Sequence, residues 1–137
     1  MIVADTNLVA YLVIGGVHTT PARAVYRKDP HWVLPRLWRS EFLSVLAVSV
    51  RAKVLSEAQA RTAWMSARAL VGSGERDPDP LRALHLAVEK GISAYDAQFV
   101  ALAQMLGTVL VTADRQLARR CPESAVLISR YAGGGSD

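Results

Sequence analysis

The fold is decided by the opening stretch of the chain, Met1-Ile2-Val3-Ala4-Asp5-Thr6-Asn7. Ile2 and Val3 predict a short buried strand, and the apolar residues that follow predict a helix over about 7–13. Asp5 falls between the two elements. A buried carboxylate must be paired, hydrogen-bonded or bound to a metal, because an isolated one is too costly. Since α/β folds place their chemistry at the carboxyl ends of their strands, Asp5 is a candidate site residue.

Length and composition indicate one globular domain. The chain has 137 residues, of which 51% are hydrophobic and 20% are charged, so wholesale disorder is excluded. We expect a single domain over 1–132 and a flexible Gly-rich tail over 133–137. The formal net charge is +4. A basic excess of this size suits nucleic-acid binding but is equally common on proteins that never touch nucleic acid.

The number of cysteines and the lengths of the apolar stretches indicate the cellular compartment in which we expect the protein. The single Cys121 excludes an intrachain disulfide and a zinc knuckle and fits a reducing environment. The three histidines lack metal-ligand spacing. No basic leader with a long apolar core opens the chain, and the apolar stretch 42–50 is far shorter than the roughly 20 residues of a spanning helix. We therefore expect a soluble, cytoplasmic protein with no membrane partner.

Local signals alternate between helix and strand along the rest of the chain. Thr20 before Pro21 predicts an N-cap, Ser56 and Gln59 have the spacing of a capping box, and Gly91 has the place of a C-cap glycine. Helices are predicted over about 20–28, 37–52, 56–71, 81–90, 93–106 and 114–120, and strands over 32–34, 108–111 and 125–128. This alternation predicts an α/β sandwich with a mostly parallel sheet.

Four acids stand where apolar structure gives way to a turn or helix, or lie inside an apolar helix. Asp5 and Asp114 follow predicted strands, Asp96 falls in a helix first turn, and Glu41 lies among apolar neighbours in the helix 37–52. Each has a structural alternative. The aspartates are all placed to cap helices, and Glu41 could lie on a solvated stripe.

Taken together, the four acids favour a metal site. Strand-end aspartates of a parallel sheet share one edge, and helix first turns on that edge add further carboxylates. Unit charges about 4 Å apart repel by about 4 kcal/mol at an effective dielectric near 20, so such a cluster needs a cation. All-oxygen ligands point to Mg²⁺ or Mn²⁺. Carboxylate-held ions of this kind are the usual means of hydrolysing phosphodiesters.

The same acids lie in sequence motifs that resemble a known family, the PIN-domain ribonucleases, and within it the VapC-type toxins of type II toxin–antitoxin systems. The order and spacing of the motifs agree over nearly the whole chain. The matching segments are Val3-Ala4-Asp5-Thr6-Asn7, Ser40-Glu41, Ala94-Tyr95-Asp96-Ala97 with Val100-Ala101-Leu102-Ala103, and Val111-Thr112-Ala113-Asp114-Arg115-Gln116-Leu117.

The resemblance implies a fold, an activity and a site. The fold would be a PIN-like three-layer α/β/α sandwich with a mostly parallel, short central sheet. The activity would be a metal-dependent endoribonuclease that hydrolyses RNA phosphodiester bonds with Mg²⁺ or Mn²⁺. The metal-binding and catalytic carboxylates would be Asp5, Glu41, Asp96 and Asp114, and the supporting polar residues Thr6, Asn7 and Thr112, with Thr6 or Asn7 orienting Asp5 and Thr112 at the rim.

The resemblance also implies partners: an RNA substrate, a small antitoxin protein and a second copy in a homodimer. Arg36, Arg39 and Arg115 adjoin the motifs and are candidates for holding the RNA backbone, with solvated arginine as the alternative. Many relatives carry a further acid where this chain has Arg115 and Gln116, which puts a second firmly bound metal in doubt. Two other functions stay open: a PIN-type nuclease of RNA processing or structured DNA, and a non-catalytic PIN domain that binds RNA or protein.

Overall fold

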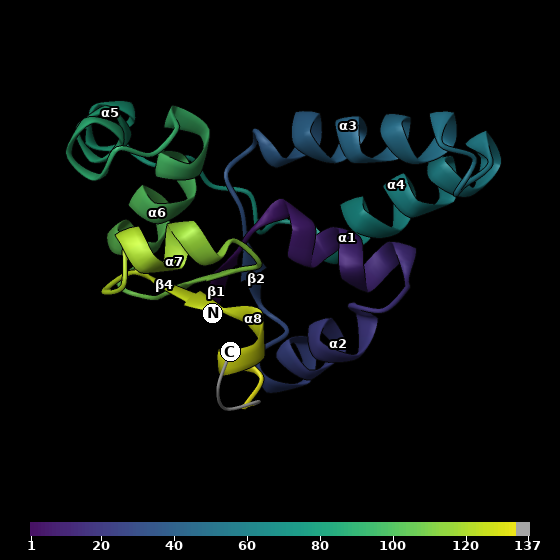
Figure 1. The fold of residues 1–137 in the computed structure, drawn as a ribbon, viewed down its shortest axis with the longest axis horizontal. Coiled ribbons are helices and arrows are strands. Elements are labelled where there is room, and N and C mark those ends of the chain that lie inside the picture. Colours follow the sequence, from purple (N-terminus) through teal and green to yellow (C-terminus); the bar gives the residue numbers. More distant parts are fainter. Residues whose placement is uncertain (134–137) are drawn as a thin grey trace.

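The computed structural model describes residues 1–133, which form a four-stranded parallel sheet flanked by helices (Figure 1). This confirms the predicted α/β class. The elements are β1 (Ile2–Ala4), α1 (Thr6–Ile14), α2 (Thr19–Lys28), β2 (Trp32–Val33), α3 (Trp38–Arg51), α4 (Glu57–Val71), α5 (Pro80–Lys90), α6 (Ala94–Leu106), β3 (Leu110–Thr112), α7 (Arg115–Arg120), β4 (Ala125–Leu127) and α8 (Ile128–Tyr131).

The order of the strands determines which loops meet. The sheet runs β2-β1-β3-β4, so β1 and β3 are the central neighbours. Val3 pairs with Val33 on one side and with Leu110 on the other. Because all strands are parallel, the segments that follow β1 and β3 leave the same edge of the sheet side by side, and the Asp5 amide donates to the Val111 carbonyl at 3.2 Å.

The core explains why strands of only two or three residues hold together. Every residue of β1, β2 and β3 is buried, so these strands are packed on both faces as parallel strands require. Beside the sheet, α3 and α4 form a helical hairpin. Trp38 and Phe42 of α3 stack with Trp64 of α4 at ring-centroid distances of 5.9 and 6.3 Å. Burying such aromatic area contributes strongly to stability.

Most predicted caps are confirmed. Ser56 and Gln59 form the reciprocal bonds of a capping box, and Gly91 ends α5 with a φ of 64°. Thr20 is not an N-cap: α2 begins at Thr19, whose hydroxyl donates to the Tyr11 carbonyl at 3.0 Å and so ties α2 to α1. The residue at the N-cap position is His18, whose side chain makes no capping bond.

Two other boundaries differ from the sequence prediction. Strand β3 covers Leu110–Thr112 instead of 108–111, because its pairing partners on β1 and β4 lie opposite those residues. The predicted strand 125–128 ends at Leu127, and the short α8 follows it without a separate signal. Of the expected tail, only Gly133 lies within the described residues. No helix in the described part of the chain is long and apolar enough to cross a membrane.

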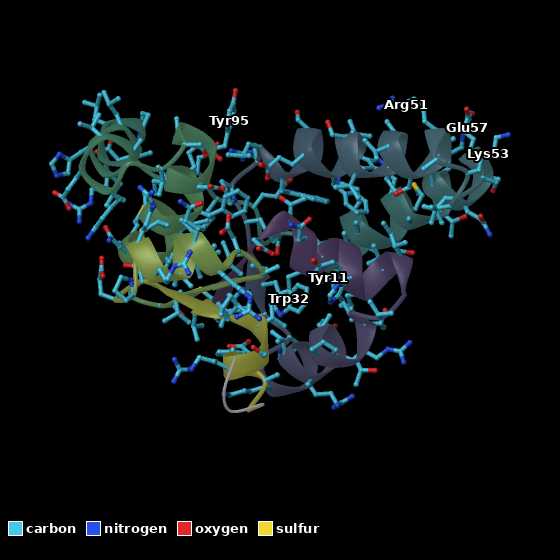
Figure 2. The ribbon with its side chains drawn as sticks, viewed as in Figure 1. Tyr11, Trp32, Arg51, Lys53, Glu57 and Tyr95 are labelled. Atoms are coloured by element: carbon cyan, nitrogen blue, oxygen red, sulfur yellow. The ribbon has the colours of Figure 1, made fainter. Side chains whose placement is uncertain are left out.

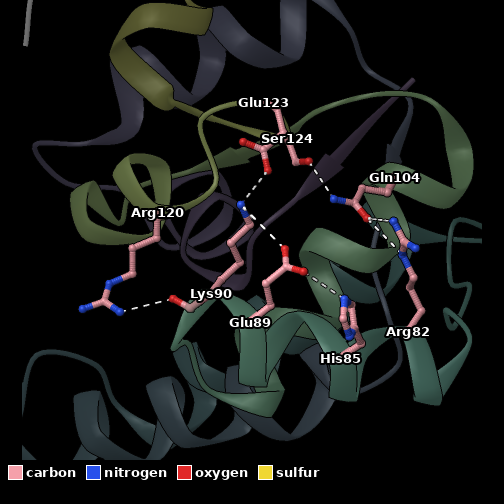
Figure 3. Close-up of polar contacts among 8 residues, drawn as sticks. All are labelled: Arg82, His85, Glu89, Lys90, Gln104, Arg120, Glu123 and Ser124. Carbon is pink, nitrogen blue, oxygen red and sulfur yellow. Dashed lines mark hydrogen bonds and ion pairs between the residues drawn. The ribbon is translucent and has the colours of Figure 1, made fainter.

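The α5–α6 pair is tied to the end of α7 and the turn before β4 by polar contacts (Figure 3). The Arg120 guanidinium donates to the carbonyls of Lys90 and Gly91 at 3.2 and 3.0 Å. The Lys90 ammonium lies 3.3 Å from the Glu123 carboxylate. These bonds hold the turn between α5 and α6 against the end of α7 and the turn before β4.

Candidate active site

The four predicted acids line one cavity at the carboxyl edge of the sheet. Its volume is about 250 Å³, and each acid comes from a different segment: Asp5 after β1, Glu41 in α3, Asp96 in α6 and Asp114 before α7. The three supporting polar residues, Thr6, Asn7 and Thr112, line the same cavity. The structure thus brings together residues that lie up to 109 positions apart in the sequence.

Asp5 is the most firmly held of the acids. One carboxylate oxygen accepts from the Leu8 amide at 2.8 Å and caps α1, while the other accepts from the Thr112 hydroxyl at 2.7 Å and the Ala113 amide at 2.9 Å. Burial raises the pKa of Asp5, opposed by these hydrogen bonds, and the nearby charge of Asp114 raises it further. Thr112 is therefore a buried anchor for Asp5 instead of a rim residue.

Thr6 orients Glu41 rather than Asp5. Its hydroxyl donates to a Glu41 oxygen at 2.6 Å. Burial raises the pKa of Glu41 and the charges of Asp96 and Asp5 raise it further, while the bond from Thr6 lowers it. Asn7 lines the cavity, but within residues 1–133 its side chain makes no hydrogen bond.

Asp96 and Asp114 line the same cavity and repel each other electrostatically. Asp114 caps α7 by accepting from the Leu117 amide at 3.0 Å. The Asp96 amide donates to the Ser93 hydroxyl at 3.0 Å, and the same hydroxyl interacts with the Asp96 carboxylate. Burial raises the pKa of Asp96 and the charge of Asp114 adds to this rise, while the hydrogen bond from Ser93 lowers it. Apart from Ser93, no described group stabilises the charge of the Asp96 carboxylate.

The donors of this cavity suit a hard cation. Glu41 and Asp114 each retain one carboxylate oxygen without a hydrogen bond in the described chain, and Asp96 adds a carboxylate whose hydrogen-bond partner is the Ser93 hydroxyl. Among residues 1–133, no group of three or more His, Cys, Asp or Glu side chains is arranged so that it could hold a metal ion. The chemistry of the cavity therefore suits a cation bound through few direct protein ligands, as is usual for Mg²⁺, which keeps several of its waters.

Two of the three arginines that we expected to bind RNA are occupied elsewhere. Arg36 donates from its backbone amide and its guanidinium to Asp77, both at 2.9 Å. Arg39 makes a two-pronged pair with Glu75 at 2.6 and 2.5 Å. Both acids lie in the loop before α5, so these pairs fasten that loop to α3. Arg115 has no such partner in the described chain.

The fold and the site define a class of protein: an α/β domain with a short parallel sheet whose carboxyl edge gathers acidic side chains. Comparison with known proteins agrees. The PIN domain family model matches residues 2–121. Ribonuclease VapC3 of Pyrobaculum aerophilum is 32% identical over 117 residues, which are 85% of this chain and 69% of that protein.

The crystal structure of PAE2754 from Pyrobaculum aerophilum has the same fold. It matches with a TM-score of 0.75 at 22% identity, over 96% of this chain and 93% of that chain. The chain belongs to the PIN domain family, and the resemblance seen in its sequence motifs is confirmed.

Replacing two of the acids by their amides should change stability in opposite directions. In EDTA, Asp96→Asn should raise the melting temperature by a few degrees. The substitution removes a charge that is repelled by the neighbouring carboxylates, and relief of this repulsion should stabilise the fold by about 1 kcal/mol or less. Asp5→Asn should lower stability by about 1–3 kcal/mol, because an amide cannot accept from all three donors. Thermal melts of both variants measure this. Stabilisation by Asp5→Asn would contradict its assignment as an anchor.

The effect of Asp96→Asn should depend on pH. The folded-state pKa of Asp96 is raised, so the native state binds more protons than the unfolded state between the ordinary pKa and the raised one. Stability is lost as pH rises through that window. The advantage of Asp96→Asn in EDTA should be greatest above the raised pKa and vanish below the ordinary pKa of an aspartate, as urea unfolding of both proteins would measure. A difference that does not change with pH would contradict charge repulsion as its cause.

Proposed function

We propose that this chain is a metal-dependent endoribonuclease that hydrolyses RNA phosphodiester bonds and acts as the toxin of a toxin–antitoxin pair. One observation carries the proposal: four carboxylates from four separate elements line a single cavity in a chain that is 32% identical to ribonuclease VapC3. An intact set of acids is what a cutting enzyme needs and what a domain that only binds RNA could have lost.

The cofactor we propose is Mg²⁺ or Mn²⁺, held by Asp96 and Asp114 with Glu41 and Asp5 completing the negative cavity. When bound, such an ion polarises a phosphoryl oxygen and lowers the pKa of a water. Burial and mutual repulsion raise the pKa of Glu41 and Asp96, so the charged forms of these carboxylates are disfavoured in the cavity. A divalent cation would stabilise the charged forms, which supports this choice.

The chain's own residues orient the site. Thr112 and the amides of Leu8 and Ala113 hold Asp5 in one position. Thr6 occupies one Glu41 oxygen and leaves the other for the cavity. The Leu117 amide does the same for Asp114. Orientation by fixed donors removes the entropy cost of arranging these groups when the substrate phosphate arrives.

The partners we propose are a small antitoxin protein and a second copy of the chain, with the cytoplasm as the location. The name of the VapC3 relative supports the antitoxin. An apolar groove of about 470 Å³ between α3 and α4 offers a surface for it, and Leu43 on its wall is 51% exposed. Three large apolar residues of the hairpin, Trp38, Trp64 and Met65, are candidates for this contact. Trp38 is fully buried and Trp64 is half-buried, so Met65, which is 69% exposed, is the one of them that a partner could contact.

Cleavage of RNA is the direct test. Purified wild-type protein with Mg²⁺ or Mn²⁺ should cut total RNA at discrete sites, and Asp96→Asn should reduce the rate about 100-fold or more, because several kcal/mol of charge stabilisation depend on the cation. Glu57→Gln is the matched control, since Glu57 lies at the far end of the α3–α4 hairpin (Figure 2). Equal cutting by wild type and Asp96→Asn, or none with either metal, would remove the proposal.

Thr6 should affect the rate through Glu41. Thr6→Val keeps the shape of the side chain but removes the bond to Glu41, which should lower kcat about tenfold or more. Since that bond lowers the pKa of Glu41, its loss should also move the acidic limb of the pH–rate profile to higher pH. Thr6→Ser should restore both. A loss of stability with an unchanged pH profile would assign Thr6 to packing alone.

A further inference from the structure

Two further cavities adjoin the cavity of the four acids. The cavity of the acids shares Thr112 with a second cavity, of about 260 Å³, which is lined by Tyr11, His18 and Arg115. That cavity shares Arg115 with a third and larger hollow, of about 730 Å³, lined by Arg119 and Arg130. The three cavities are therefore neighbours, and they follow one another from the acids past α1 to α7, β4 and α8, the last three of which lie together in Figure 1. We call five residues that line the second and third cavities, Tyr11, His18, Arg115, Arg119 and Arg130, the basic track.

The positive charge of this track is uncompensated. Within residues 1–133, the guanidinium groups of Arg115, Arg119 and Arg130 make no hydrogen bond or ion pair. The acid on the turn before β4, Glu123, is already paired with Lys90 (Figure 3). Unpaired guanidinium groups that line neighbouring cavities suit a series of phosphates, which their planar forks bind with two hydrogen bonds each.

The track also carries an aromatic pair. The rings of Tyr11 and His18 stack with centroids 4.5 Å apart and an angle of 30° between their planes. The bond from Thr19 to the Tyr11 carbonyl holds the start of α2 against α1 and so keeps the pair together. Aromatic side chains beside a basic groove are the usual platform for an unpaired base, because every base has a face that can stack.

We propose that the basic track binds single-stranded RNA next to the bond that is cut, with Arg115, Arg119 and Arg130 on successive phosphates and a base against the Tyr11–His18 pair. The inference rests on the proposed ribonuclease function. The alternative occupant, an acidic protein segment, explains the arginines but not the stacked rings or the position of the track next to the cavity of the acids.

Binding can be measured without cutting by placing each variant in the Asp96→Asn protein. The probe is a fluorescein-labelled, single-stranded RNA dodecamer of mixed sequence, followed by anisotropy over a range of salt concentrations. Arg119→Gln and Arg130→Gln should each weaken binding several-fold and reduce the slope of log K against log salt by about 0.7, the value for one phosphate contact on a single strand.

The aromatic pair has a different expected signature. His18→Ala, at an exposed position, should weaken binding about tenfold and leave the salt slope unchanged, because stacking releases no counterions. The control is Arg51→Gln, which removes the same charge at the far end of α3 (Figure 2) and should change neither quantity. A duplex of the same length should bind more weakly than the single strand, since its bases cannot reach the rings.

The outcomes separate the two proposals. If the wild type cuts RNA but the arginine variants bind like Arg51→Gln, the track is wrong and the ribonuclease proposal stands. If the wild type does not cut and the variants still lose binding with the expected slopes, the ribonuclease proposal fails and the track remains a site for RNA. If polyglutamate binds with the same losses and the RNA dodecamer does not bind, the track takes an acidic protein segment, and the inference is overturned.

Discussion

The carboxylate of Asp5 is the interaction on which both fold and site depend. It accepts from the Leu8 amide at the start of α1 and from the Thr112 hydroxyl and Ala113 amide after β3. These bonds join the two central strands and the first helix at a single point. They also offset the cost of burying a charge there. The carboxylate whose negative charge serves the proposed chemistry therefore also joins the segments that follow the two central strands.

A second constraint concerns the repulsion between the acids, which helix ends help to offset. Asp5 and Asp114 are the N-caps of α1 and α7, and Glu41 and Asp96 lie in the first turns of α3 and α6. Each helix N-terminus carries partial positive charge and stabilises a nearby carboxylate by about 0.3–1 kcal/mol. Capping a helix and belonging to a charged site are therefore not alternatives in this fold, because the N-termini of α1, α3, α6 and α7 meet at the same cavity.

The sequence predicts those parts that local chemistry controls. The alternation of strands and helices and the place of Asp5 and Asp114 after strands could be predicted because parallel strands end at a common edge. The partner of Glu41 could not, since the bond from Thr6 depends on the rotation of α3 about its axis. Nor could the pair of Arg39 with Glu75, whose residues are 36 positions apart and meet only because the loop before α5 returns to α3.

The arginines around the cavity of the acids differ in whether their charge is paired, and this difference favours approach of a polyanion from one side. Those near the start of α3 are neutralised by acids of the returning loop, and Arg120 is bound to carbonyls at the end of α5. The arginines of α7 and α8 that line the neighbouring cavities, in contrast, keep their charge unpaired. The carboxylates repel a polyanion that approaches them. Positive charge on the surface beside the cavity must therefore attract the polyanion first. Steering of this kind falls off over about 10 Å at 0.1 M salt, which restricts it to residues adjoining the cavity. The only flank that meets this condition in the described chain is the one formed by α7, β4 and α8.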